Sequence, residues 1–181
     1  MNLVLSAEPT ASAPAVLLRP WRAEDAASLA AAHRDPLMRD QLTTPLADQA
    51  DAAQWIRDQD AAWANRTRLS FAVLQDAPTG RLVGHVVLKK TSASSAEVGY
   101  WTSAETRGQG IAPRALEAVS RWAFGEQRVM PLTRLDLLHA IDNHASCRVA
   151  EKCHYPLNSL LPARPPQLPA RHLHTRTCSN A

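Results

Sequence analysis

The stretch of residues 97–124 constrains the fold of this chain more than any other part of the sequence. It begins like a short strand (EVGYW), continues as a glycine-containing turn (TSAETRGQGIA) and ends as an amphipathic helix (PRALEAVSRWAF). A helix that starts directly after a strand presents its first backbone N–H groups at the strand end, where they and the helix dipole attract an anion. The stretch therefore predicts a strand–turn–helix unit with an anion-binding cradle.

Small residues in this turn fit a ligand that comes close to the backbone. Arg107, Gly110 and Ala112 stand in the spacing R-x-x-G-x-A, and glycine permits both unusual backbone angles and the close approach of a bulky group. Pro113 follows near the helix start, where its missing N–H costs the helix no hydrogen bond. A glycine turn also occurs in ordinary strand-to-helix connections, so the interpretation as a cradle depends on the rest of the chain.

Composition and charge indicate a single globular domain. The 181 residues, 45% of them hydrophobic, are enough to bury a core without disulfides or metal. The formal net charge is +3, but the basic residues are scattered among acidic ones, so nucleic-acid binding is not expected. Residues 1–14 are rich in Ala, Ser and Pro and predict a flexible N-terminal leader, which leaves 15–181 as one domain.

Cysteine and histidine usage favours a reduced, metal-free protein in the cytoplasm. Cys147, Cys153 and Cys178 are odd in number, which is typical of free thiols. His172 and His174 alternate onto one face of an expected strand, but no second pair has metal-ligand spacing, so no metal is expected. The chain lacks an apolar run of about 20 residues and a signal-like N-terminus, so neither membrane insertion nor export is expected.

Patterns along the chain predict a mixed α/β (α+β) fold. Strands are expected at residues 16–21, 69–74, 81–89, 96–102, 134–141, 157–161 and 172–177, and helices at 25–33, 45–65, 112–124 and 143–153. Three consecutive antiparallel strands run from 69 to 102, and the last two strands form a hairpin around the proline-rich loop 162–169 at the sheet edge. The result is a central, mostly antiparallel sheet with helices on both faces.

With these elements in order, the sequence resembles the GNAT superfamily of acyl-CoA-dependent N-acetyltransferases. Three segments carry the resemblance: LRPWRAEDA at the start, VGYWTSAETRGQGIA in the middle and DNHASCRVAEK near the end, each on the element where the family has it. The resemblance runs from about residue 15 through nearly the whole chain and is strongest for the ribosomal-protein alanine/serine N-acetyltransferase branch. It implies the GNAT fold and acetyl-CoA as cosubstrate.

The resemblance also assigns roles to individual residues. It implies that the glycine turn wraps the coenzyme A pyrophosphate, that the strand before it binds the pantetheine arm, and that Ser146 lies near the thioester sulfur. The residues implied in cofactor binding are Tyr100, Trp101, Thr102, Arg107, Gly108, Gln109, Gly110, Ile111, Ala112 and Asn143.

Acetyl transfer to an amine needs three further groups. An amine at an N-terminus (pKa about 8) or on lysine (pKa about 10.4) is mostly protonated at neutral pH, so a base must take its proton. Glu97, at the start of the central strand, is the candidate base, acting directly or through water. Ser146 is the candidate proton donor to the thiolate, and a main-chain N–H near Trp101 is the candidate oxyanion donor. Glu97 and Ser146 could also have no catalytic role. A glutamate at the edge of a strand, for example, is commonly just solvated.

Two departures from the family pattern bear on the acceptor. The helix-terminal glycine is missing at Cys153-His154-Tyr155, so either His154 adopts a left-handed conformation or the helix end differs. Asn158 and the loop 162–169 replace the usual sequence where the acceptor groove is expected. The sequence therefore predicts a substrate other than the ribosomal proteins.

The sequence thus predicts an N-acetyltransferase that transfers acetyl directly from acetyl-CoA to a primary amine in a ternary complex. The acceptor is a protein N-terminus or a small-molecule amine, and the enzyme is a monomer or homodimer. Two alternatives stay open: transfer of a different acyl group, and a catalytically inactive coenzyme A-binding sensor or interaction module.

Overall fold

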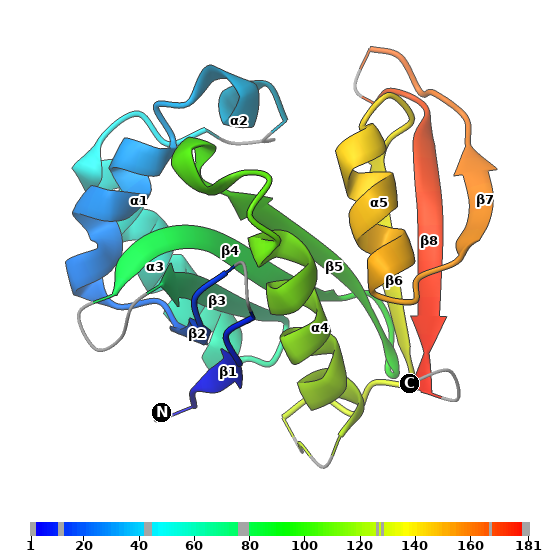
Figure 1. The fold of residues 1–181 in the computed structure, drawn as a ribbon, viewed down its shortest axis with the longest axis horizontal. Coiled ribbons are helices and arrows are strands. Elements are labelled where there is room, and N and C mark those ends of the chain that lie inside the picture. The colour runs from blue at the N-terminus through cyan, green and yellow to red at the C-terminus, as the bar shows by residue number, and fades with distance from the viewer. Residues whose placement is uncertain are drawn as a thin grey trace.

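Among the described residues, eight strands form one sheet in the order β1-β2-β3-β4-β5-β6-β8-β7 (Figure 1). The computed structural model of the chain describes residues 3–10, 13–41, 45–75, 80–125, 127, 129–166 and 168–178. Neighbouring strands are antiparallel except β5 and β6, which are parallel. The predicted mixed, mostly antiparallel sheet is confirmed. The strands are β1 Leu5–Ala7, β2 Val16–Pro20, β3 Arg68–Gln75, β4 Arg81–Lys90, β5 Ser95–Thr102, β6 Arg134–Ala140, β7 Leu157–Leu161 and β8 Arg171–Thr177.

Helices cover both faces of this sheet. α4 packs on β1, β2, β4 and β5, whereas α3 packs on β3 and against α1. Figure 1 shows α4 in front of the sheet and α3 behind it. None of the described helices is long and apolar enough to span a membrane. The helices are α1 Ala26–Ala32, α2 Pro36–Gln41, α3 Gln49–Ala64, α4 Ile111–Phe124 and α5 His144–Lys152, with short 3₁₀ turns at Ala23–Asp25 and Ala104–Thr106.

The side chains of β3 alternate between the two faces of the sheet and show what packs on each face. Leu69, Phe71 and Val73 belong to the larger apolar cluster, together with apolar residues of α4. Between them, the hydroxyl of Ser70 donates a hydrogen bond of 2.6 Å to the side-chain oxygen of Gln59 on α3. Successive side chains of a strand point to opposite faces, so β3 separates a layer containing α4 from a layer containing α1 and α3.

Residues 1–14, predicted to be a flexible leader, contain a strand. Leu5–Ala7 forms β1 and pairs antiparallel with β2. The guanidinium of Arg114 on α4 holds this segment by donating hydrogen bonds to the carbonyl oxygens of Ala7 at 3.1 Å and Pro14 at 2.8 Å. The prediction is wrong for β1, because its partners lie elsewhere in the chain and leave no local pattern.

The region between the first two predicted helices also differs from expectation. A further helix, α2, occupies Pro36–Gln41, where a break was expected. The long helix begins at Gln49 rather than near residue 45, because the carboxylate of Asp48 caps it by accepting from the N–H groups of Ala50 at 2.8 Å and Asp51 at 2.9 Å. Most of the expected hairpin turn, residues 76–79, lies outside the described residues.

Candidate active site

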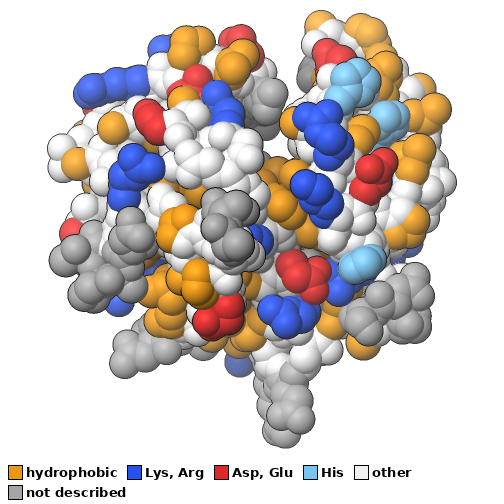
Figure 2. Space-filling model, in the orientation of Figure 1, with side chains coloured by type: hydrophobic (Ala, Val, Ile, Leu, Met, Phe, Trp, Pro, Cys, Tyr) orange, Lys and Arg blue, Asp and Glu red, His pale blue; other side chains and the backbone are white. Residues whose placement is uncertain are grey.

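β5 and β6 separate before their ends and leave an opening in the sheet. Their parallel pairing joins residues 95–98 to residues 134–137, whereas β5 continues to Thr102 and β6 to Ala140. α4 and α5 lie on either side of this opening (Figure 1). A pocket of about 490 Å³ lies between them, and Figure 2 shows this face hollowed between its two halves.

Most of the predicted site residues meet at this pocket. They come from two segments that are separate in the sequence: one runs from the end of β5 through the glycine turn to the start of α4, and the other is the start of α5. Ten of the twelve predicted residues line it: Tyr100, Trp101, Thr102, Arg107, Gly108, Gly110, Ile111, Ala112, Asn143 and Ser146.

The glycine turn has the geometry of an open cradle. Gly108 and Gly110 have φ values of +78° and +71°, and a Cβ added at either would meet no protein atom within 4 Å. The protein itself therefore does not crowd these positions, and the space beside them belongs to the pocket that they line. No described side chain caps the start of α4 at Gly110, so its first N–H groups are available to an anion.

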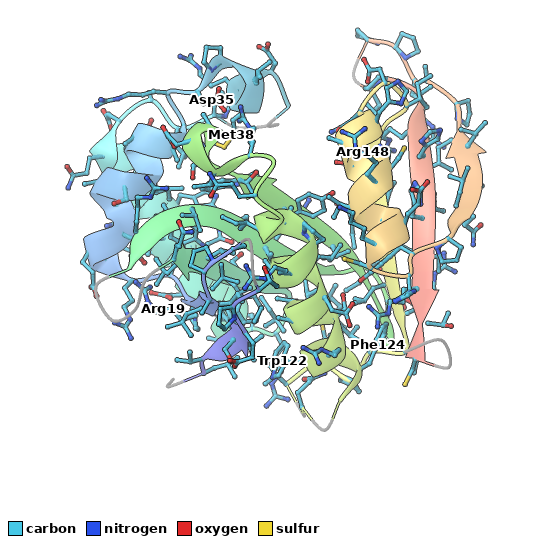
Figure 3. All side chains as sticks on the ribbon, in the orientation of Figure 1. Arg19, Asp35, Met38, Trp122, Phe124 and Arg148 are labelled. Atoms are coloured by element: carbon cyan, nitrogen blue, oxygen red, sulfur yellow. The ribbon has the colours of Figure 1, made fainter. Side chains whose placement is uncertain are left out.

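Arg107 is already paired within the protein. Its guanidinium forms an ion pair with the carboxylate of Asp35, which precedes α2. This contact joins the glycine turn to the segment that carries Leu37 and Met38, two further residues of the pocket lining. Figure 3 labels Asp35 and Met38 on this side of the opening. Arg107 therefore holds one wall of the pocket, and its charge is partly neutralised.

α5 supplies basic residues that the sequence analysis missed. Arg148 and Lys152 lie four positions apart and line the pocket together with Val149. Figure 3 labels Arg148 on α5 beside the opening, and Figure 2 shows Lys and Arg side chains on that side of the hollow. Basic residues on a short helix usually face solvent, so only the orientation of α5 could have revealed them.

Asn143 caps α5, as predicted. Its side-chain oxygen accepts a hydrogen bond of 3.1 Å from the N–H of Ser146. This bond fixes the first turn of α5 relative to the end of β6 and sets the backbone of Ser146 at the pocket wall. At the other end of the helix, His154 has a φ of +59°, which confirms the left-handed conformation suggested by the missing glycine.

Tyr100 lies beside Ser146 with its hydroxyl buried. Burial raises the pKa of the Tyr100 phenol to about 12, and the nearby Ser146 hydroxyl lowers it by a smaller amount. The Tyr100 hydroxyl nevertheless makes no hydrogen bond of acceptable geometry to any described residue. A phenol that is neutral and unpaired can donate to Ser146 after a small side-chain movement.

Glu97 and Gln109 do not line the pocket. Glu97 lies five residues before the end of β5, about 16 Å away along the strand, and its carboxylate pairs with Lys89 of β4 at 2.9 Å. Its predicted role as the base is therefore not supported by its position. The side-chain amide of Gln109 donates to the carbonyl of Glu105 at 3.0 Å, which stabilises the turn from its exposed side.

The end of the pocket near α2 has uncharged aromatic groups beneath it. The Trp101 ring lies 6.1 Å from the His33 ring and 5.9 Å from the His85 ring, measured between centroids. Burial lowers the pKa of His33, and burial lowers that of His85 to about 3. Both imidazoles are neutral at pH 7, so this end of the pocket favours an apolar or uncharged group.

A larger hollow of about 940 Å³ lies elsewhere, beside β2 and α3. None of the predicted site residues lines it. Of the arginines that line it, Arg19 is held by two hydrogen bonds of 2.7 and 2.8 Å from its guanidinium to the carboxylate of Asp25. We assign the site to the smaller pocket, because there the uncapped start of α4 lines the same space as Arg148 and Lys152 of α5.

Comparisons with known proteins identify the family to which this fold belongs. A family model described as an acetyltransferase (GNAT) domain matches residues 15–155, and no curated protein matches the chain. Similar solved structures include a GNAT-family acetyltransferase from Bacillus anthracis (18% identity, 98% of this chain and 99% of that one, TM-score 0.82). They also include a putative ribosomal-protein-serine acetyltransferase from Vibrio cholerae (25%, 90% and 93%, 0.73).

A third similar structure holds the coenzyme. It is the RimJ protein of Mycobacterium smegmatis in complex with CoA-disulfide, which is 21% identical over 92% of this chain and 83% of that one, with a TM-score of 0.79. The family model covers well over half of the chain, including β5, the glycine turn and α5. The chain therefore belongs to the GNAT acetyltransferase family and is an acyl-CoA-dependent N-acetyltransferase with acetyl-CoA as its cosubstrate.

Proposed function

We propose that the protein transfers the acetyl group of acetyl-CoA directly to a primary amine in a ternary complex, and that the preferred acceptor is an α-amino group. One observation carries the proposal: the uncapped start of α4 and the first turn of α5 flank a single pocket at the point where β5 and β6 separate. An anion-binding end and a proton-donating end therefore belong to one binding site.

The coenzyme would bind with its pyrophosphate at the turn that contains Gly108 and Gly110. Backbone N–H groups there provide hydrogen bonds and a positive dipole without a buried side-chain charge. Because Arg107 is paired with Asp35, the phosphate charge is balanced chiefly by Arg148 and Lys152 on the facing helix. The pantetheine arm would then run along residues 99–102 of β5, beyond the last pairing with β6.

The thioester would lie at the first turn of α5. The amine attacks the thioester carbonyl, a main-chain N–H near Trp101 stabilises the oxyanion, and the intermediate collapses to the amide and the thiolate of coenzyme A. Ser146 donates the proton that the thiolate takes up. Tyr100 acts through Ser146: its unpaired hydroxyl is positioned to donate to the Ser146 oxygen as that oxygen becomes more negative.

Deprotonation of the amine distinguishes between acceptor classes. Among the described residues that line the pocket there is no aspartate, glutamate or histidine, so the proton leaves through water. The enzyme can then use only the fraction of the acceptor amine that is already neutral in solution. At pH 7 this is roughly 10% of an α-amine with pKa 8 but about 0.04% of a lysine amine with pKa 10.4. This difference of about two hundredfold favours an α-amino group over lysine.

The comparisons support a peptide acceptor. One similar structure is described as a putative ribosomal-protein-serine acetyltransferase, a protein whose name specifies a protein substrate. In this chain the α2 end of the pocket presents Leu37, Met38 and Trp101. These side chains suit a small apolar or uncharged first residue of a peptide. Free polyamines and aminoglycosides, which carry several charges, fit this surface poorly.

The test is the release of free coenzyme A thiol with a panel of acceptors at pH 7. The panel contains peptides that begin with Ala or Ser, the same peptides with a blocked N-terminus and an internal lysine, and small amines. We expect thiol release and the mass gain of one acetyl group for free α-amines only. Tight coenzyme binding without thiol release on any amine would instead support a binding module, and faster reaction on lysine would contradict the water-mediated route.

A further inference from the structure

Four potential metal ligands meet behind α5, outside the acetyl-CoA pocket. They are His139 of β6, His172 and His174 of β8, and Cys147 of α5. One ligand atom from each lies within 4.8 Å of the ligand atoms of the other three. His139 and His172 are directly opposite each other in the β6–β8 pairing, and α5 lies in front of β6 beside β8 (Figure 1). The cluster is therefore built by three elements.

Only one pair in this cluster has a spacing that can be recognised in the sequence, so the cluster was not predicted. His172 and His174 alternate on β8, whereas His139 and Cys147 come from β6 and α5. Strand pairing and helix packing bring them together. Of the four, His139 and His174 are buried, and Cys147 and His172 are partly exposed.

Backbone hydrogen bonds direct two of the imidazoles into the cluster. Nδ1 of His174 lies 3.0 Å from the carbonyl oxygen of Tyr155, and Nδ1 of His139 lies 2.8 Å from that of Ala140. A carbonyl accepts, so each Nδ1 carries the proton and each Nε2 keeps a free lone pair. Metal-bound histidines have this arrangement, in which the second nitrogen donates to a backbone carbonyl.

The cluster lacks enough donors to satisfy these lone pairs. Nε2 of His174 is buried and has no hydrogen-bond partner among the described residues, and the His174 side chain is almost fully buried, with 3% of the residue exposed. Sγ of Cys147 lies 3.3 Å from Nδ1 of His172 and 3.8 Å from Nε2 of His139. The single thiol proton cannot serve two imidazoles and also reach His174. A cation would satisfy every one of these groups.

The distances suit a tetrahedral transition-metal ion. With metal–nitrogen bonds of about 2.0–2.1 Å and a metal–sulfur bond of about 2.3 Å, tetrahedral ligand atoms lie about 3.3–3.6 Å apart. The two measured sulfur–nitrogen distances bracket this range, and the farthest pair needs to close by about 1 Å.

We propose that His139, Cys147, His172 and His174 bind one divalent zinc-class ion, as a site separate from acetyl transfer. Three imidazoles and one thiolate are the ligands that Zn²⁺ prefers, and a closed tetrahedral set leaves no position for substrate. On binding, the thiol of Cys147 releases its proton to solvent. The ion ties α5 to β6 and β8, so its role is to fix the helix that carries Ser146 on its other side.

Cobalt provides the direct test, because Co²⁺ replaces zinc and absorbs light. Untagged, fully reduced, metal-free protein is titrated with Co²⁺ and then with Zn²⁺. We expect one equivalent of Co²⁺ to give the visible spectrum of a four-coordinate ion and a cobalt–thiolate charge-transfer band, and Zn²⁺ to displace it. At a hundredfold excess of Zn²⁺ over its Kd, the melting temperature should rise by roughly 5–10 °C.

Matched variants separate the cluster from adventitious binding. Cys147→Ser should abolish the charge-transfer band, and His174→Asn, which keeps a donor for the Tyr155 carbonyl but removes Nε2, should weaken Zn²⁺ binding at least tenfold. Cys178→Ser and His154→Asn change residues outside the cluster and should bind like the wild type. Equal affinity in all four variants would overturn the proposal.

A measurement on the wild-type protein covers the case in which a variant does not fold. Zn²⁺ should slow alkylation of Cys147 but not of exposed Cys178, as followed by peptide mass spectrometry. Equal alkylation rates with and without Zn²⁺, or the absence of stoichiometric Co²⁺ binding to reduced protein, would refute the site.

Discussion

Replacing Tyr100 by phenylalanine should make the protein more stable and less active. The Tyr100 side chain is half-buried, but its hydroxyl is buried and makes no hydrogen bond to the described residues. A buried polar group without a partner costs about 1–3 kcal/mol, so its removal should raise the free energy of unfolding by about 1 kcal/mol or more. For a chain of this length, each 1 kcal/mol raises the melting temperature by about 2–4 °C.

The same variant should slow the chemical step. If the Tyr100 hydroxyl supports Ser146 as the proton donor, kcat for thiol release should fall about tenfold or more while the KM for acetyl-CoA stays unchanged. The pKa of this phenol is about 12, so the loss should be the same throughout the range from pH 6 to pH 9. In a Ser146→Ala background the Tyr100 substitution should have no additional effect, because the two residues act as one unit.

Tyr155→Phe is the matched control. The Tyr155 hydroxyl is also buried, but it lies 2.7 Å from the hydroxyl of Ser120, which itself donates to the carbonyl of Leu116 at 2.7 Å. Tyr155 is therefore the donor, and its loss should reduce stability by about 1 kcal/mol without changing kcat. If Tyr100→Phe lowers stability in the same way, or leaves kcat unchanged, the proposed role of Tyr100 is wrong.

Four further substitutions test other parts of the structure. Gly110→Val should abolish acetyl-CoA binding in a calorimetric titration, because a side chain there enters open pocket space. Valine at the left-handed φ of +71° also lowers the stability, so the titration is done at a temperature where the circular dichroism spectrum is native. Arg148→Gln should raise the Kd for acetyl-CoA about three- to tenfold at low salt and less at high salt, whereas the same change at exposed Arg121 should have no effect. His154→Gly should raise the free energy of unfolding by about 1 kcal/mol, since it relieves a left-handed side chain; an unchanged urea midpoint would contradict this. Burial lowers the pKa of His85 to about 3, so the unfolded state takes up its proton first as the pH falls below about 6.5. His85 should therefore reduce stability by about 1.4 kcal/mol per pH unit between pH 6 and pH 4, and in His85→Leu the loss measured by urea unfolding should be less steep.

Local patterns were sufficient to predict the central part of the fold. The glycine turn, the amphipathic helix α4 and the cap at Asn143 each depend on residues close together in the sequence, and each lies where the pattern predicts. The same holds for the antiparallel strands β3, β4 and β5. Periodicity and turn residues are local signals, so they can be recognised without knowledge of the tertiary structure.

Features that depend on distant contacts could not be predicted in this way. β1 is held by β2 and by Arg114 of α4. The residues Leu5–Ala7 themselves carry no pattern that predicts those partners. Glu97 illustrates the same limit along a strand. The pattern places it in β5 correctly, but only the sheet shows that the pocket lies at the other end of that strand and that Lys89 neutralises the carboxylate.

The two faces of α5 explain why one short helix can affect both binding and chemistry. Val149 and Lys152 lie along the pocket with Arg148, whereas Cys147 faces β6 and β8. Ser146 lies about 9 Å before Lys152 along the helix axis. Substitutions in the last turn should therefore act on acetyl-CoA affinity, and those in the first turn on kcat. An ion bound at Cys147 would fix both of its neighbours, Ser146 and Arg148, whereas Lys152 lies more than one helical turn farther along.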